Sequence, residues 1–203
     1  DKMYIFSAGT TTGTPSFNIP LVIFTKTDLS GAKNIEEAAA LLEAKAADRY
    51  YQSQIHGNEP AAGEAALAQI GRLDTAYGDD LLQTLNIYVI PRLNPDGSYK
   101  YQRNSLTGIN MNRDMLLAQT QEIKNHHYVY GLFEPELAID SHEYTYQPEN
   151  ASGGYNDMMV ASGHNGNSGD EFVQYSEMFV RLPFNSLFSY GMQPSYYLNV
   201  TNG

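Results

Sequence analysis

Two residues with metal-binding side chains, His56 and Glu59, stand three positions apart where an apolar, strand-like run gives way to a helix-like one. A neutral imidazole nitrogen and a carboxylate oxygen are ligands that suit a borderline cation such as Zn²⁺. A third candidate, His142, directly follows residues 136–141, an apolar run that predicts a strand. Three such ligands leave an open position for water or a carbonyl oxygen. The pattern therefore predicts a hydrolytic site with one zinc ion.

Cationic side chains gather in the segment between two of the ligand-bearing strands. They are Arg103 and Arg113, and Asn112 stands beside the second. A guanidinium group presents a planar fork that matches a carboxylate, and a neighbouring carboxamide can complete a clamp. The Asn-Pro-Asp-Gly turn at residues 94–97 fixes the entry to this segment. We therefore expect a binding site for the free C-terminal carboxylate of a peptide.

The elements that must position these side chains alternate between strands and helices. Apolar periodicity and turn residues predict strands at 3–8, 18–25, 50–56, 86–92 and 136–141, and helices at 35–46, 59–73, 79–85, 116–133 and 169–180. This order predicts an α/β fold with a mixed, mostly parallel twisted sheet flanked by helices. Ligands bind at the carboxyl ends of strands in such sheets, where His56, Asn94 and His142 are expected. We find no repeat and no linker, and expect residues 1–203 to form a single catalytic domain.

Composition excludes several other classes of function. The net charge of −11 disfavours nucleic acid and anionic membranes as partners. The absence of cysteine excludes disulfides and thiolate ligands from the chain. No run approaches the roughly 20 apolar residues of a membrane span. The chain opens at Asp1 without a signal peptide, and we expect a processed, secreted or periplasmic protein, with a cytoplasmic one as the alternative.

The other histidines are not expected to bind the metal. His126 and His127 fall inside a predicted helix beside Lys124, and we expect both to be exposed to solvent. His164 lies in a stretch rich in glycine, asparagine and serine and is expected in a loop.

Several motifs in a fixed order carry a family resemblance. They are His56-x-x-Glu59, PRLNPDG at 91–97, Arg103, GINMNRD at 108–114 and Asp140-Ser141-His142. Their order and spacing over roughly residues 50–145 resemble the zinc carboxypeptidase family of the carboxypeptidase A type. The opening hairpin looks like that of the family as well.

The resemblance implies a fold and a role for each matching residue. The implied fold is a mixed eight-stranded sheet between helices. The implied zinc ligands are His56, Glu59 and His142. Arg103 would stabilise the oxyanion of the tetrahedral intermediate, and Asn112 with Arg113 would bind the terminal carboxylate of a peptide substrate. The implied reaction is hydrolysis of the C-terminal residue by metal-activated water.

The chain departs from the family pattern at three places. Asn110 replaces an acidic residue that hydrogen-bonds a ligand imidazole in relatives, so we expect a more labile zinc site. Glu143 replaces a small polar residue that helps bind substrate. The general base of the family is a glutamate on a late strand, and none of the later glutamates suits that position: Glu143, Glu149, Glu171 and Glu177. We therefore expect the chain to end before this strand.

Other readings stay open at this point. One is a zinc N-acyl amino acid deacylase on the same scaffold, which the Asn-Arg-Asp sequence at 112–114 favours. Another is a peptide- or wall-binding relative without catalysis. The tyrosine that caps substrate in relatives could be Tyr190, Tyr196 or Tyr197. The sequence indicates neither the side-chain specificity nor the oligomeric state.

Overall fold

The computed structural model describes residues 2–42, 47–144, 157–163 and 168–197. The chain divides into two compact units, residues 1–144 and residues 145–203, which are treated separately. The interpretation of residues 1–203 as one domain stays a prediction. The predictions for His164 and Glu149 lie outside the described residues.

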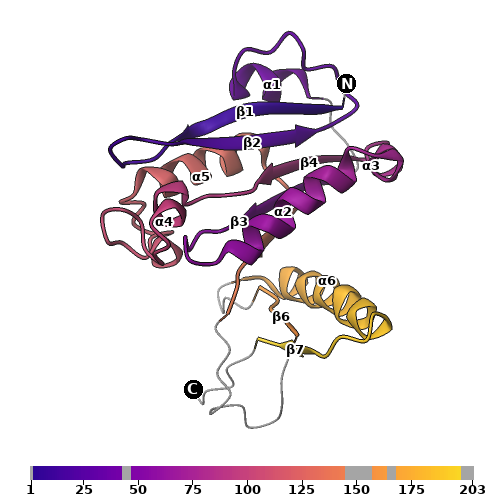
Figure 1. Cartoon of the computed structure of the whole chain (residues 1–203). Coiled ribbons are helices and arrows are strands. Elements are labelled where there is room, and N and C mark those ends of the chain that lie inside the picture. The colour runs from indigo at the N-terminus through magenta and orange to yellow at the C-terminus, as the bar shows by residue number, and fades with distance from the viewer. Residues whose placement is uncertain (1, 43–46, 145–156, 164–167, 198–203) are drawn as a thin grey trace. The chain divides into compact units, whose positions relative to one another are not determined.

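The first unit contains most of the secondary structure (Figure 1). Its elements are β1 (Met3–Thr10), β2 (Asn18–Phe24), α1 (Ile35–Leu41), β3 (Ala47–Ser53), α2 (Pro60–Leu73), α3 (Ala76–Leu81), β4 (Leu85–Ile90), α4 (Pro95–Tyr99), the 3₁₀ turn η1 (Met111–Arg113), α5 (Gln121–Phe133) and β5 (Leu137–Ser141).

These strands form one five-stranded sheet in the order β1-β2-β4-β3-β5. The β1–β2 and β2–β4 pairs are antiparallel, whereas β3 pairs in parallel with both β4 and β5. The predicted α/β fold with a mixed sheet and flanking helices is confirmed. Half of the pairings in this sheet are parallel, and the described part of the sheet has fewer strands than the eight that the family resemblance implies.

The parallel pairing places the carboxyl ends of β4, β3 and β5 side by side. Ser53 of β3 stands opposite Ser141 of β5, and Gln52 of β3 stands opposite Ile90 of β4. Because parallel strands run in the same direction, the loops that follow them emerge side by side. These loops carry the predicted metal ligands and the Asn-Pro-Asp-Gly turn.

Each face of the sheet has its own apolar core. Ile19, Leu21 and Ile23 of β2 belong to the core on the side of α1 and α5. The alternate residues Val22 and Phe24 belong to the core beneath α2. In Figure 1, α2 crosses the face of the sheet that is turned to the viewer and α5 lies behind the sheet. This alternation is the two-residue period of a strand that is buried on both faces.

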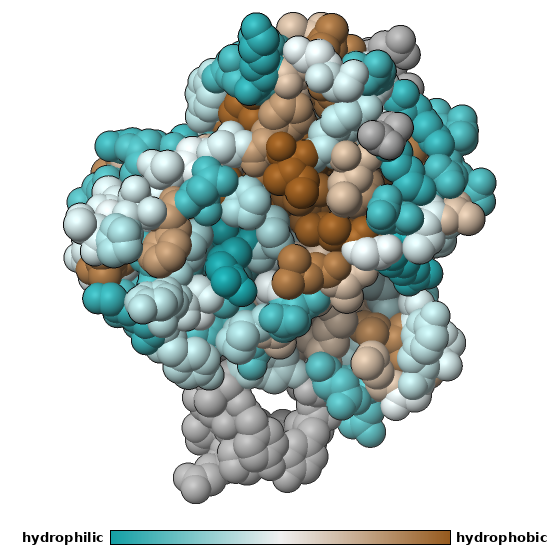
Figure 2. Space-filling model, turned by 45° about the horizontal axis from the view of Figure 1, so that its top comes forward, coloured by the Kyte–Doolittle hydropathy of each residue, from teal (hydrophilic) through white to brown (hydrophobic). Residues whose placement is uncertain are grey.

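The two faces are covered to different extents. The helix α2 packs on β3 and β4, and β1 lies at the edge of the sheet. Ile5 of β1 is therefore 66% exposed, although its cross-strand neighbour Val22 is buried. In Figure 2, polar residues cover much of the face shown, and apolar residues gather in a band near its middle.

Local capping corrects two predicted helix boundaries. The helix predicted at 116–133 begins only at Gln121, because the Asp114 carboxylate accepts hydrogen bonds from the backbone N–H groups of Gln119 and Thr120. Burial acts to raise the pKa of Asp114, but these hydrogen bonds hold it below its usual value. The helix predicted at 79–85 is α3, which starts earlier because Thr75 caps it.

Two other expectations meet different outcomes. The helix predicted at 35–46 is confirmed at Ile35–Leu41 but ends there, and residues 43–46 lie outside the described residues. The Asn34 side chain caps it by accepting a hydrogen bond from the backbone of Glu37. The turn predicted at 94–97 forms the start of the short helix α4, for which Asn94 is the N-cap. The sequence therefore identified the turn residues here but not the helical turn that they form.

The second unit contains β6 (Met158–Val160), α6 (Asp170–Ser189) and β7 (Pro194–Tyr196). The strands β6 and β7 pair in parallel. The helix predicted at 169–180 is confirmed, but it is longer than expected because α6 continues through Pro183. Phe184 of this helix stacks on Tyr196 of β7, with ring centroids 4.5 Å apart. Within the described parts of the chain, none of the helices has the length and apolar character to cross a membrane.

The prediction that His126 is exposed is wrong. Its side chain is buried beneath the sheet, and Nδ1 lies 2.9 Å from the hydroxyl oxygen of Tyr50 on β3. Burial lowers the pKa of His126 to about 4, because desolvation disfavours the charged imidazolium. His127, the next residue on α5, is exposed as predicted.

The buried His126 predicts acid sensitivity of the fold. An unfolded chain protonates this histidine near pH 6.5, whereas the folded chain does so only near pH 4. The unfolded state therefore binds more protons between these values, so the free energy of unfolding falls as the pH drops through this window. The loss amounts to roughly 3 kcal/mol at its lower end.

The test is urea unfolding of metal-free protein between pH 4 and 7. The double variant Tyr50→Phe/His126→Leu removes both polar partners, and we expect a shallower dependence of stability on pH. The control His127→Gln should keep most of the wild-type slope. Equal slopes in the double variant and the wild type would contradict the prediction.

Candidate metal centre

The turn after β3 places the first two predicted ligands. Gln54 adopts a left-handed backbone conformation (φ 54°), and its side chain donates a hydrogen bond to the carbonyl of Gly57. The chain then reverses, and the backbone N–H of Glu59 donates to the carbonyl of His56. Glu59 is the N-cap residue of α2, whose first residue is Pro60. The three-residue spacing thus spans one tight turn ahead of the helix.

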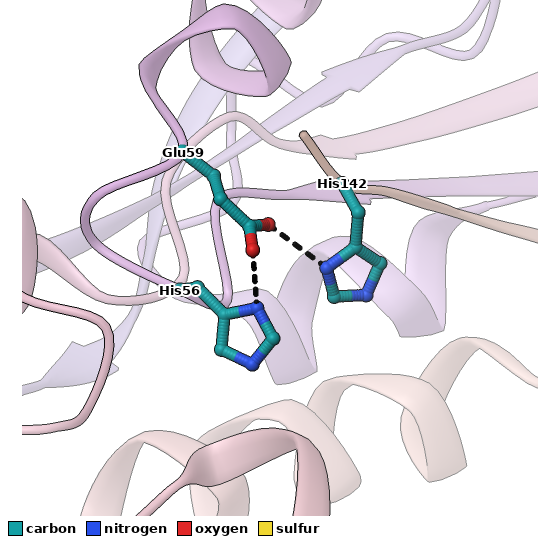
Figure 3. A group of neighbouring side chains, drawn as sticks. All are labelled: His56, Glu59 and His142. Atoms are coloured by element: carbon teal, nitrogen blue, oxygen red, sulfur yellow. Dashed lines mark hydrogen bonds and ion pairs between the residues drawn. The ribbon is translucent and has the colours of Figure 1, made fainter. Parts of the chain in front are cut away.

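The predicted ligands converge on one point. The Nδ1 atom of His56 lies 2.7 Å from one carboxylate oxygen of Glu59, and the Nδ1 atom of His142 lies 2.9 Å from the other. Figure 3 shows both imidazole rings turned toward this carboxylate. The possible ligand atoms of the three residues all lie within 4.8 Å of one another. The strand ends therefore bring together residues that are 83 positions apart.

The outer nitrogens of both rings have partners of their own. His56 Nε2 lies 3.1 Å from the carboxamide oxygen of Asn110, and His142 Nε2 lies 3.0 Å from a carboxylate oxygen of Asp140. Such partners fix the orientation of a ligating imidazole and leave the inner nitrogen free for a metal. Sequence reasoning assigned no role to Asp140. Its position two residues before His142 on a strand was the available signal, because such residues share a face.

The protonation of the centre follows from these contacts. Burial acts to raise the pKa of the Glu59 carboxyl, but hydrogen bonds from His142, His56 and the Glu143 backbone lower it to about 2. Burial likewise acts to lower the pKa of His142, but hydrogen bonds to Asp140 and Glu59 raise it to about 9. The carboxylate is thus held in the charged form that binds a cation.

Arg103 reaches the same carboxylate. Its Nη1 atom donates a hydrogen bond to Glu59 Oε1 at 3.1 Å, and its side chain is half exposed. The neighbouring Gln102 side chain donates to the carbonyls of Asn104 and Ser105, which folds this loop back on itself. The loop therefore presents the guanidinium group at the open side of the centre.

Asn112 and Arg113 lie on the turn η1. The Asn110 carboxamide oxygen accepts a hydrogen bond from the Asn112 backbone and starts this turn. The Asn112 side-chain nitrogen lies 3.5 Å from His142 Nε2, at the limit of hydrogen bonding. Among the described residues, Arg113 donates to the backbone oxygen of Asn112, and its guanidinium group is exposed. The structure thus brings five of the six predicted residues into contact and leaves the Arg113 head group facing solvent.

Glu143 has a structural position beside the centre. Its carboxylate accepts a hydrogen bond from the backbone N–H of Ala61 at the start of α2, and its own N–H donates to Glu59. A negative charge is stabilising at a helix N-terminus. This carboxylate therefore anchors β5 to α2, and the expectation that it is not the general base agrees with its engagement.

The donor set fits zinc. Two imidazole Nδ1 atoms and one carboxylate are a combination found in catalytic zinc sites, where a further position stays open. Both outer imidazole nitrogens are satisfied, and the third residue is held as a carboxylate. The arrangement suits metal-assisted hydrolysis, with the Arg103 guanidinium group beside the ligand carboxylate.

Comparison with known proteins identifies the family. The family model described as zinc carboxypeptidase matches residues 28–163. The chain belongs to the zinc carboxypeptidase family.

Relatives of this family align with part of the chain. It is 36% identical over 98 residues to carboxypeptidase 2 of Trichophyton tonsurans and to probable carboxypeptidase 2 of Trichophyton verrucosum. These alignments cover 47% of the chain and 18% and 19% of the relatives. The matched region thus spans about a fifth of the length of these curated relatives.

Two solved structures share the fold of the chain. A metallo-carboxypeptidase from Burkholderia cenocepacia superimposes with a TM-score of 0.70 at 16% identity, covering 98% of this chain and 49% of that one. Thrombin activatable fibrinolysis inhibitor superimposes with a TM-score of 0.68 at 14% identity, covering 97% of this chain and 54% of that one. The chain therefore has the fold of about half of these molecules.

Asn110 distinguishes this member of the zinc carboxypeptidase family from the pattern expected of the family. Its carboxamide oxygen occupies the place of a carboxylate and still meets His56 Nε2. A neutral acceptor orients the ring but does not raise the basicity of the other ring nitrogen as a negative charge does. The structure thus keeps the geometry and omits the charge.

We expect Asn110→Asp to slow the removal of Zn²⁺ by a chelator, with about a tenfold or larger gain in metal affinity because the added charge makes His56 a stronger ligand. The measurement is competition with a chromophoric chelator at neutral pH. Asn34→Asp makes the same chemical change at the α1 cap, where the side-chain acceptor is kept, and should leave metal affinity unchanged. Identical zinc release from wild type and Asn110→Asp would refute the role assigned to Asn110.

Proposed function

We propose that this chain is part of a zinc-dependent metallocarboxypeptidase that removes C-terminal residues from peptides. The observation that carries the proposal is the meeting of His56, His142 and Arg103 on the two oxygens of Glu59. Membership of the zinc carboxypeptidase family supports the same reaction.

The metal ligands in this proposal are His56, Glu59 and His142. A zinc ion held there would lower the pKa of a water molecule and polarise the scissile carbonyl. Asn110 and Asp140 hold the two rings in the orientation that directs Nδ1 toward the ion. The buried side of the centre, formed by His56 and Glu59, excludes solvent from these ligands.

Arg103 stabilises the negative charge that develops on the carbonyl oxygen. Its guanidinium group already lies against the ligand carboxylate and is half exposed, so it can turn to a substrate oxygen without leaving the centre. A preorganised cationic donor at such a position acts mainly on the transition state. We assign Arg103 this role.

Arg113 and Asn112 bind the terminal carboxylate of the peptide. The exposed Arg113 fork and the Asn112 amide stand on one short turn next to His142. A bidentate contact with a carboxylate would orient the last peptide bond toward the metal. This pair gives the proposed preference for free C-termini.

The acidic residues next to the third ligand are already engaged. The Asp140 carboxylate pairs with His142, and the Glu143 carboxylate caps α2. We therefore assign no general base among the described residues.

The first experiment combines elemental analysis with hydrolysis of peptides that carry free or amidated C-termini. The proposal expects about one zinc per chain and cleavage of free C-termini only. Cleavage of N-acyl amino acids alone would replace it with a deacylase. Zinc without turnover of either substrate would leave a binding protein, and absence of zinc would overturn the metal centre.

Substitution of Arg103 and of Arg113 is expected to change different kinetic constants. Arg103→Ala should lower kcat by roughly 100-fold with little change in KM, because its contact is made mainly in the transition state. Arg113→Ala should mainly raise KM, by about tenfold or more, because it removes a charged contact to bound substrate. Steady-state kinetics on one short peptide measures both.

The matched control is Arg72→Ala, at the far end of α2, where the guanidinium stacks on Tyr77. It should change neither constant. The assignment of the two roles would be wrong if the Arg103 and Arg113 variants showed the same pattern.

A further inference from the structure

One buried carboxamide connects the segments that carry the metal ligands and Arg103. Asn94 follows β4 and is completely buried. Its side-chain nitrogen donates to the carbonyl of Ile55 at 3.2 Å and to the carbonyl of Asn104 at 3.3 Å. Its side-chain oxygen accepts from the backbone N–H of Gly97 at 2.9 Å. A single amide group therefore joins three separate segments.

The bonded carbonyls are neighbours of functional residues. Ile55 directly precedes the ligand His56, and Asn104 directly follows Arg103. The backbone of Asn94 adds a further tie, because its N–H donates to the carbonyl of Gln54 at 3.1 Å. His56 and Arg103 are thus each next to a residue whose backbone carbonyl is hydrogen-bonded to Asn94.

Two glycines let these segments approach closely. A Cβ atom on Gly57, the residue after His56, would lie 2.0 Å from the carbonyl carbon of Gly97. A Cβ atom on Gly97 would lie 2.5 Å from Asn94 Nδ2 and 2.8 Å from the carbonyl oxygen of Asn104. The backbones are therefore in direct contact around the amide, and neither segment can shift alone without breaking a buried hydrogen bond.

We propose that Asn94 is a positioning residue that holds the His56 turn and the Arg103 loop in a fixed mutual arrangement. It touches neither substrate nor metal. This inference rests on the proposed function, because the arrangement matters only if a metal-bound substrate must meet Arg103. Misplacement by about 1 Å at such a site can cost about 100-fold in rate.

Two substitutions separate this role from the capping of α4. Asn94→Asp keeps an oxygen for the Gly97 N–H but turns a second oxygen toward the carbonyls of Ile55 and Asn104, where repulsion replaces two hydrogen bonds. Asn94→Ser keeps a capping oxygen and lacks the reach to both carbonyls. We expect both variants to keep the N-cap of α4 and to lose the hydrogen bonds that Asn94 donates to the carbonyls of Ile55 and Asn104.

The matched control is Asn86→Asp. Asn86 is a buried carboxamide near the start of β4, and it bonds Thr25, just after β2, and Asp48, near the start of β3. We expect this change to lower the stability of the fold without altering the centre.

The experiment measures zinc affinity by chelator competition, the visible spectrum of the Co²⁺-substituted protein, thermal stability, and kcat and KM. Both Asn94 variants should lose about tenfold to 100-fold in zinc affinity and shift the Co²⁺ spectrum. Their kcat should fall about as far, with KM changed much less. Asn86→Asp should leave the metal readouts at wild-type values at a comparable loss of stability.

The outcomes separate this inference from the proposed function. If wild type binds zinc without peptide turnover, the function fails and the metal readouts still test Asn94. Wild-type zinc affinity and spectrum in folded Asn94 variants would overturn the inference. So would equal losses in Asn86→Asp, or a failure of both Asn94 variants to fold while Asn86→Asp folds, because Asn94 would then serve the fold as a whole.

Discussion

The Glu59 carboxylate is the point on which the centre depends. One oxygen meets His56 and Arg103, and the other meets His142 and the backbone N–H of Glu143. A buried carboxylate is costly unless such partners satisfy it. The four partners come from three segments of the chain, because His142 and Glu143 are adjacent, so the carboxylate requires all three segments to fold together. The chemistry of the site therefore depends on how its loops pack against one another.

The parallel register of β4, β3 and β5 brings these loops together. Strands β4, β3 and β5 run in the same direction, and their carboxyl ends are aligned to within a residue. A shift by one residue would turn His142 to the opposite face of β5 and remove it from the centre. The two apolar cores resist such a shift in β3 and β4, whose side chains they bury, whereas β5 is held in register by its backbone pairing with β3. Burial remote from the site thus sets its geometry.

Sequence reasoning succeeded where local pattern and strand direction decide the outcome. His56 and Glu59 share one turn, and His142 follows a strand whose carboxyl end could be predicted. It failed where a side-chain partner outside the helical pattern decides. His126 is buried because the hydroxyl group of Tyr50, 76 positions away, is a hydrogen-bond partner for its imidazole ring in the core. The late start of α5 depends on the Asp114 carboxylate, which satisfies backbone groups that a helix would have used. Neither partner is visible in helical periodicity.

The Asn-Pro-Asp-Gly turn shows how the hydrogen bonds required of a buried side chain select its residue type. This turn lies where the His56 turn and the Arg103 loop meet. Pro95, the first residue of α4, has no N–H, and the Asn94 side chain accepts the N–H of Gly97, the third residue of the helix. The residue before Pro95 must accept this bond and also donate to two carbonyls, 39 and 10 positions away. Aspartate offers no donor and serine no second polar atom, so a carboxamide of this length is the fitting choice. Gly97 in turn has no Cβ because Asn94 and the Asn104 carbonyl occupy that space. The hydrogen bonds of the buried Asn94 carboxamide thus make one turn both the start of a helix and the connection between two functional loops.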